Sequence, residues 1–177
     1  MSTEATPGRS SFDSALLGRG LAALRIFVGV IALSNGLAKL FSFRAIEIGP
    51  YSATLVDRPE ARGILESEAG RNDLPLLPSI VNDVVLPSYD VMQWLITFTE
   101  LGTGALLLLG LLSRGAALIV FAQHFGLQLL YLSSGRFAFE QPHEWVPPLI
   151  LALVPAGLIW GLDGRLGRNR DRVRWPS

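Results

Sequence analysis

The sequence predicts an all-α protein, an integral membrane four-helix bundle with a long extracytoplasmic loop between helices 1 and 2. Half of the 177 residues are hydrophobic and only 17% are charged, whereas soluble domains carry about 25% charged residues. Four apolar segments come close to the roughly 20 residues that a membrane-spanning helix needs. Arginines gather at one side of these segments, as the positive-inside rule requires.

The first span is predicted at residues 19–43, after a polar segment, residues 1–18, that we expect to be a mobile N-terminal tail. Helical spacing places charged and small residues of this span on one narrow arc, and small residues there let a second helix approach closely. The arc comprises Arg25, Gly29, Ala32, Gly36 and Lys39. It is either a simple packing stripe or, as we expect, a packed face on which Arg25 meets Glu100, because a lone arginine facing lipid is costly.

Residues 44–90 form the one long connection, with eight acidic residues and four arginines. Asp57, followed by Pro59, has the pattern of a capped helix start, and Gly70 that of a stop, so a short helix is predicted at residues 59–69. The later apolar part of the connection is interrupted by prolines and too short to span. It either lies on the membrane surface or caps the bundle.

The other three spans follow in close succession. They are predicted at residues 91–112, 116–132 and 145–160, with a tight turn at Arg114 between the first two. Pro155 is expected to kink the last span, because a proline inside a helix removes a backbone hydrogen bond and clashes with the preceding turn.

The arginines also predict the orientation. Five of them lie in residues 164–177, a basic tail that follows a transmembrane domain at residues 19–163. Four spans put both termini on the same side, and Arg114 lies on that side too. We therefore predict a multi-pass protein with cytoplasmic N- and C-termini.

Polar side chains of the first three spans concentrate in the outer half of the predicted bundle. An ionisable side chain inside a span usually faces other helices or a wet cavity. We take Glu100 and His124 as candidate catalytic residues, with a set of polar neighbours as candidate cofactor-binding residues. That set is Gln93, Thr97, Gln128, Tyr131, Asn35 and Lys39.

A quinone suits such a polar track, because its carbonyls need hydrogen-bond donors and its reduction consumes protons. Glu100 and His124 can supply protons, since burial and neighbouring groups tune the pKa of both residue types. The alternative is that the polar groups satisfy one another and only lock the bundle, as such groups often do between membrane helices. The sequence leaves both interpretations open.

The composition excludes several other kinds of site. Without cysteine the chain cannot perform thiol–disulfide chemistry, ligate an iron–sulfur cluster through thiolates or attach haem covalently. Haem between His124 and His143, the only histidines, is not expected, because their depths should differ by roughly 10 Å or more. No metal-ligand cluster and no glycine-rich phosphate loop is present, so no metal is expected. The net charge of zero gives no sign of a nucleic-acid partner.

Two segments resemble the signatures of DoxX-type membrane proteins. One is residues 24–41, LRIFVGVIALSNGLAKLF, with an arginine, paired glycines and a final Gly-x-x-Lys-Leu. The other is residues 99–118, TELGTGALLLLGLLSRGAAL, with Glu-x-x-x-Gly and Gly-Leu-x-x-Arg. The Gly-Leu-Asp at residues 161–163 fits as well. The long first connection is similar to that of the DoxD branch, the small subunit of thiosulfate:quinone oxidoreductase.

The resemblance implies a subunit of a redox complex in a bacterial or archaeal cell membrane, passing electrons from an outside sulfur compound to quinone. It implies a membrane or peripheral redox partner subunit in addition to the lipid bilayer, and it carries over Arg25 and Glu100 as catalytic residues. The acidic connection counts against direct encounter with dianionic thiosulfate, unless Arg44 or Arg136 offsets it locally.

Three functional hypotheses follow. The first is a quinone-interacting redox subunit, the second a non-catalytic membrane anchor or assembly subunit, and the third a small transporter. The absence of a cofactor motif favours the second, and the absence of an internal repeat weakens the third. Whether the chain is itself an enzyme, and whether it forms a homo-oligomer, stays open.

Overall fold

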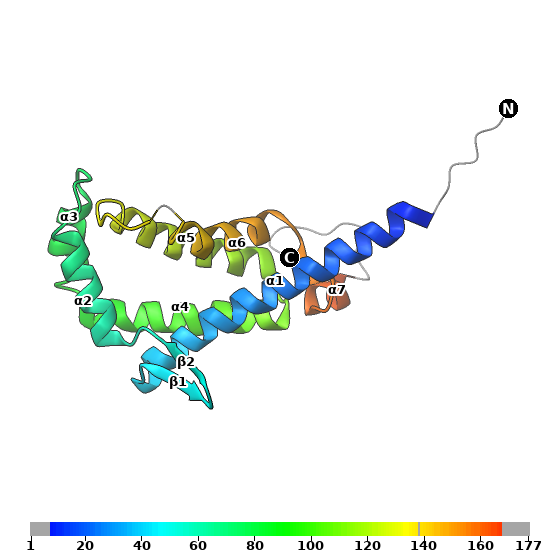
Figure 1. Cartoon of the computed structure of the whole chain (residues 1–177), viewed down its shortest axis with the longest axis horizontal. Helices are drawn as coiled ribbons and strands as arrows, with labels where there is room; N and C mark the ends of the chain where they lie inside the picture. The colour runs from blue at the N-terminus through cyan, green and yellow to red at the C-terminus, as the bar shows by residue number, and fades with distance from the viewer. Residues whose placement is uncertain (1–7, 138, 168–177) are drawn as a thin grey trace.

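The structure, a computed structural model, describes residues 8–137 and 139–167, and helices make up most of them (Figure 1). The basic tail beyond residue 167 and the first seven residues lie outside this part. The elements in order are α1 Gly8–Phe41, β1 Ala45–Ile48, β2 Tyr51–Thr54, α2 Arg58–Ala69, α3 Leu77–Ile80, a π-helical turn η1 Val81–Val85, α4 Tyr89–Leu109, α5 Ser113–Leu130, α6 Pro142–Leu153, a 3-10 turn η2 Ala156–Leu158, and α7 Leu162–Gly167.

The long helices form two pairs, α1 with α4 and α5 with α6, which lie in two layers (Figure 1). The α2–α3 segment lies across one end of the layers, and α7 lies at the other end. Below, the end that carries α2 and α3 is called the capped end, and the end that carries α7 is called the turn end.

Glycines bring α1 and α4 into close contact. A Cβ atom on Gly36 would lie 2.8 Å from the backbone nitrogen of Leu101, and one on Gly104 would lie 2.5 Å from that of Leu33. Gly29 faces Leu107 and Leu108 in the same way. The packing stripe predicted on the first span is confirmed, and its contacts fix the antiparallel register of α1 against α4.

Two helices are long and apolar enough to cross a membrane by length and composition, Ser14–Phe41 within α1 and Tyr89–Leu109, which is α4. α1 begins well before the predicted start of the first span, inside the predicted tail. At 1.5 Å per residue the 12 residues of α6 extend about 18 Å, less than the hydrocarbon core of a bilayer. The four-span topology therefore stays a prediction.

The predicted fourth span is interrupted before its end. α6 ends at Leu153, Val154 has extended backbone angles, and η2 follows Pro155. Proline disfavours the helical conformation in the residue before it and lacks the amide that would continue the hydrogen-bond ladder. The kink expected at Pro155 is thus a complete break.

The turn end is held by one carboxylate. Asp163 accepts hydrogen bonds from the amides of Leu112 and Ser113 and from the Ser113 hydroxyl, at 2.8 to 3.0 Å. Its own amide donates to the carbonyl of Gly110, which has a φ of +63° in the turn after α4. A buried carboxylate thereby satisfies the amides at the start of α5, where the helix dipole favours negative charge.

The long connection is folded and closes the capped end. The predicted helix at residues 59–69 is confirmed as α2, with Asp57 accepting from the Glu60 amide at 2.9 Å. Ala69, Val81 and Leu130 form a small apolar cluster that joins the connection to α5. The Asn72 amide donates to the last carbonyls of α5, at Leu129 and Leu130. The later apolar part of the connection was expected either to lie on the membrane surface or to cap the bundle, and in the structure it caps the bundle.

The β1–β2 hairpin was not predicted. Its strands are four residues each, and Ile48 pairs with Tyr51 across a two-residue turn of Gly49 and Pro50. Gly49 has a φ of +59°, a conformation that glycine adopts at no steric cost. Strands this short carry too little alternation to stand out in a sequence.

Candidate functional site

The central feature of the site is an ion pair between α1 and α4. Lys39 Nζ donates to both carboxylate oxygens of Glu100, at 3.0 Å to Oε1 and 2.8 Å to Oε2. The side chains are only 5% and 11% exposed. The glycine contacts set this geometry, because packing Gly36 against Leu101 places the next turn of α1 beside Glu100.

A third helix contributes to the same carboxylate. Gln123 Nε2 on α5 donates to Glu100 Oε1 at 3.0 Å. Glu100 is therefore shared between a cation on α1 and an amide on α5. Because a buried carboxylate needs such donors to offset its lost hydration, the cluster connects the two helix layers.

A second polar pair lies between α5 and α6. His124 Nδ1 lies 3.6 Å from Glu144 Oε2, and the side chains are 19% and 37% exposed. This distance is beyond a hydrogen bond, and the buried Nδ1 atom has no hydrogen-bond partner among the described residues. The Nδ1 atom therefore faces the Glu144 carboxylate without a full hydrogen bond.

Both pairs line a cavity of about 240 Å³ between the helix layers. α2 closes it at the capped end. The lining residues are Asn35, Lys39, Val56, Ala61, Ile64, Leu65, Ile96, Glu100, Gln123, His124, Leu127, Tyr131, Arg136, Gln141 and Glu144. Pockets for drug-sized ligands measure about 300–1,000 Å³, so this cavity fits a ring-sized group.

Five of the residues predicted from sequence line this cavity: Glu100, His124, Asn35, Lys39 and Tyr131. The others point elsewhere. Gln93 donates to the carbonyl of Asp90 at the surface, and the buried Thr97 hydroxyl donates to the carbonyl of Gln93 on its own helix. Gln128 accepts from the indole of Trp145 at 3.2 Å.

The predicted pairing of Arg25 with Glu100 is wrong. Arg25 lies 14 residues before Lys39 on α1, which corresponds to about 21 Å along the helix. Its buried guanidinium lies at the turn end, where Nη2 donates to the carbonyl of Trp160 at 3.0 Å. A Cβ atom on Gly110 or Gly161 would collide with Nη1, so these glycines make room for the arginine.

Four polar lining residues were missed: Gln123, Arg136, Gln141 and Glu144. Gln123, Leu127 and Tyr131 follow one another at four-residue spacing and so share one face of α5. The face predicted from the sequence was the neighbouring one, which contains His124 and Gln128. Arg136 stacks over the Tyr131 ring, 4.2 Å from its centre, and contacts Glu68. Glu144 lies in the first turn of α6, one residue before the predicted start of the fourth span.

A second cavity of about 210 Å³ adjoins the first, and Asn35, His124 and Glu144 line both. The rest of its wall is mostly apolar and comes from α1, α5 and α6. Those residues are Phe27, Val28, Ile31, Ala32, Val120, His143 and Pro147. His143, predicted at a different depth from His124, reaches this same cavity.

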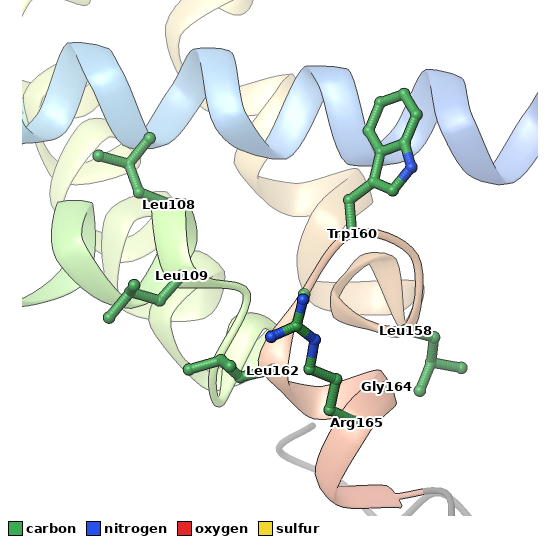
Figure 2. Close-up of a pocket in the computed structure, with 8 residues that line it drawn as sticks. Leu108, Leu109, Leu158, Trp160, Leu162, Gly164 and Arg165 are labelled. Carbon is green, nitrogen blue, oxygen red and sulfur yellow. The ribbon is translucent and has the colours of Figure 1, made fainter.

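A third hollow lies at the turn end and measures about 570 Å³ (Figure 2). Leucines of α4 and of the segment after α6 line it, together with Trp160 and Arg165, which extends into it from α7. It is wide open and brings no second ionisable side chain to Arg165. We therefore place the candidate site in the cavity at Glu100.

The donor set of the site is not that of a metal centre. Within residues 8–137 and 139–167 no three His, Asp or Glu side chains converge as metal ligands. The ionisable groups are instead one cation–carboxylate pair, Lys39–Glu100, and one imidazole–carboxylate pair, His124–Glu144. Both pairs face one small cavity. Such an arrangement can hold hydrogen-bonding carbonyls and exchange protons with them.

Comparison with known proteins gives one match. A family model described as DoxX matches residues 20–131, more than half of the chain. No curated protein and no solved structure matches it. The matched residues include α1 from residue 20 onward, the folded connection, α4 and α5, and so both members of the Lys39–Glu100 pair.

Proposed function

Because the chain belongs to the DoxX family and is a membrane protein of that type, we propose that it is the membrane subunit of a redox complex and binds a quinone head group in the cavity at Glu100. The observation that carries the proposal is the composition of this cavity. One wall offers Lys39, Glu100 and Gln123, and another offers His124 and Glu144. A quinone ring has a carbonyl at each of two opposite edges, which such a pair of walls can bind.

The proposed reaction reduces quinone with two electrons and two protons to the quinol. The electrons come from a redox partner subunit that oxidises an outside donor, for which a sulfur compound such as thiosulfate is our proposal. This chain binds the ring and supplies protons. The Lys39 ammonium and the Gln123 amide donate hydrogen bonds, and Glu100 and His124 hold protons beside the carbonyl oxygens. Glu144, 37% exposed, links His124 to water.

Access for an anionic donor is less hindered than the acidic connection indicates. Asp57 pairs with Arg44 at 2.8 Å, and the buried Glu68 contacts Arg136. The Arg44 hydrogen bond lowers the pKa of Asp57, so this carboxylate stays charged and paired near neutral pH. Because Arg136 also lines the cavity, we propose that the outer surface there is not uniformly repulsive to anions.

One observation favours the second candidate, a non-catalytic anchor. Lys39 and Gln123 already satisfy the Glu100 carboxylate, as in a purely structural lock between helices. The cavity that the Lys39–Glu100 and His124–Glu144 pairs line favours the redox subunit, because a network that only joins helices needs no space between them.

Quinone binding to purified protein in lipid nanodiscs tests the proposal. Glu100→Gln is expected to weaken binding at least tenfold, because it removes the carboxylate that orients Lys39 and that accepts and passes on protons. Asp90→Asn on the same helix is the matched control, since Asp90 is exposed and lies outside the cavity lining. Wild-type protein that binds no more quinone than empty nanodiscs would overturn the proposal and leave the anchor.

A further inference from the structure

The second cavity lies against the outer surface of α1. Phe27 and Ile31, which line it, are 61% and 39% exposed. Both lie within the Ser14–Phe41 segment, which is apolar enough to cross a membrane. The outer end of this cavity therefore faces the lipid side of the molecule, between α1 and α6.

Along this cavity the chemistry changes from apolar to polar. The outer wall is made mostly of aromatic, aliphatic and proline side chains, including Phe27, Ile31 and Pro147, with the exposed His143 beside them. The inner wall is made of Asn35, His124 and Glu144, which also line the first cavity. The two cavities thus adjoin at His124 and Glu144, which lie between the mostly apolar wall and the Lys39–Glu100 pair.

We propose that the gap between α1 and α6 is a lateral portal that holds the isoprenoid tail of the quinone. This inference rests on the proposed function and adds where the tail lies and how the ligand arrives. A quinone is a polar ring on a long apolar chain, and the two adjoining cavities have that order of chemistry. The ring passes His124 and Glu144 to reach Glu100, and the tail lies along Phe27 and Ile31 and leads back into the bilayer.

The free energy of burying each part of the quinone explains why its ring and its tail fit different walls. An apolar tail loses nothing by leaving lipid for an apolar wall, whereas polar groups at the inner end would be costly to expose to lipid. The first cavity, about 240 Å³, is too small to hold a tail of several isoprene units together with the ring. A tail therefore needs a way out, and the adjoining cavity lies at the residues that the ring would contact.

The test narrows the portal with a large side chain. Ile31→Trp fills the outer end of the second cavity, and Ile31 does not line the first cavity. Val30→Trp is the matched control, because Val30 is the neighbouring residue on α1, is 48% exposed and lines neither cavity. Binding is measured in nanodiscs for two probes, ubiquinone with a long isoprenoid tail and the same dimethoxy-methyl-benzoquinone ring without a tail.

We expect Ile31→Trp to weaken binding of the tailed quinone at least tenfold and of the tailless ring less than twofold, with Val30→Trp unchanged for both. Equal binding of the tailed quinone by Ile31→Trp and wild type would overturn the portal. So would an equal loss for both probes, which would place Ile31 on the ring. If wild type binds neither probe, the proposed function fails, an outcome distinct from failure of the portal alone.

Discussion

Glu100 receives hydrogen bonds from side chains on two other helices, and these bonds determine how its replacement changes the free energy of unfolding. Lys39 and Glu100 are both buried, so replacing either one leaves the other charge without its partner. For a buried pair that costs on the order of 3–5 kcal/mol. Replacing both removes the uncompensated charge as well, and the double substitution costs less than the sum.

A double-mutant cycle of Lys39→Met and Glu100→Gln, followed by SDS-induced unfolding, is therefore expected to show coupling well above 0.5 kcal/mol. Arg25→Met combined with Glu100→Gln is the control. Arg25 contacts Gly110, ten residues and about 15 Å along α4 from Glu100, so the effects of the two substitutions on the free energy of unfolding are expected to add. Coupling to Arg25 instead of Lys39 would contradict the structure.

At this scale the sequence identified the right kinds of residue but only some of their partners. Arg25 and Lys39 share one arc of α1, so helical periodicity alone makes either a partner for Glu100. The choice depends on how far α1 slides along α4, which the contacts of Gly36 and Gly104 decide. Glu144 was missed for a related reason, since its approach to His124 depends on how α6 packs against α5.

Among the elements, α1 and α4 depend most on close backbone contact. A Cβ atom on Gly104 would lie 2.5 Å from the Leu33 backbone nitrogen and 2.8 Å from its Cα atom, and backbone cannot move aside as a flexible side chain can. Gly102, two residues earlier on the same helix, has nothing within 4 Å of the corresponding position. The two glycines form a matched pair for substitution.

Gly104→Ala is expected to lower the melting temperature in detergent and, by pushing α1 away, to weaken quinone binding. Gly102→Ala is expected to leave binding unchanged and to be neutral or stabilising by up to about 1 kcal/mol, because alanine favours the helix over glycine. Equal effects of the two substitutions on melting and binding would show that α1 and α4 do not pack in this register.

The elements themselves were predicted unevenly from sequence. Hydropathy located α1 and α4, and the Asp57–Pro59 pattern located α2 to within one residue. The end of α6 was misplaced, because the apolar run continues past Pro155 while the backbone does not. The hairpin at Gly49 was missed, since its stability comes from pairing between two short strands that local pattern does not reveal.

For the whole molecule, the predicted topology places the capped end outside the cell and the turn end in the cytoplasm. Labelling with a membrane-impermeant thiol reagent tests it cleanly, because the native chain has no cysteine. Ser67→Cys on α2 is expected to react in intact cells, and Leu166→Cys on α7, also exposed, only after lysis. The reverse pattern would show that the protein is inserted the other way round.

The contact between Asn72 and α5 has a consequence for the order of biosynthesis. The Asn72 amide binds carbonyls that lie 57 and 58 residues later in the chain. At about 5–20 residues per second, roughly 3 to 12 seconds pass between synthesis of the asparagine and of its partners. Until then Asn72 has no α5 carbonyls to bind, and the connection cannot pack against the end of α5. The cavity at Glu100 is therefore closed only after α5 has emerged from the ribosome, as a late step in maturation.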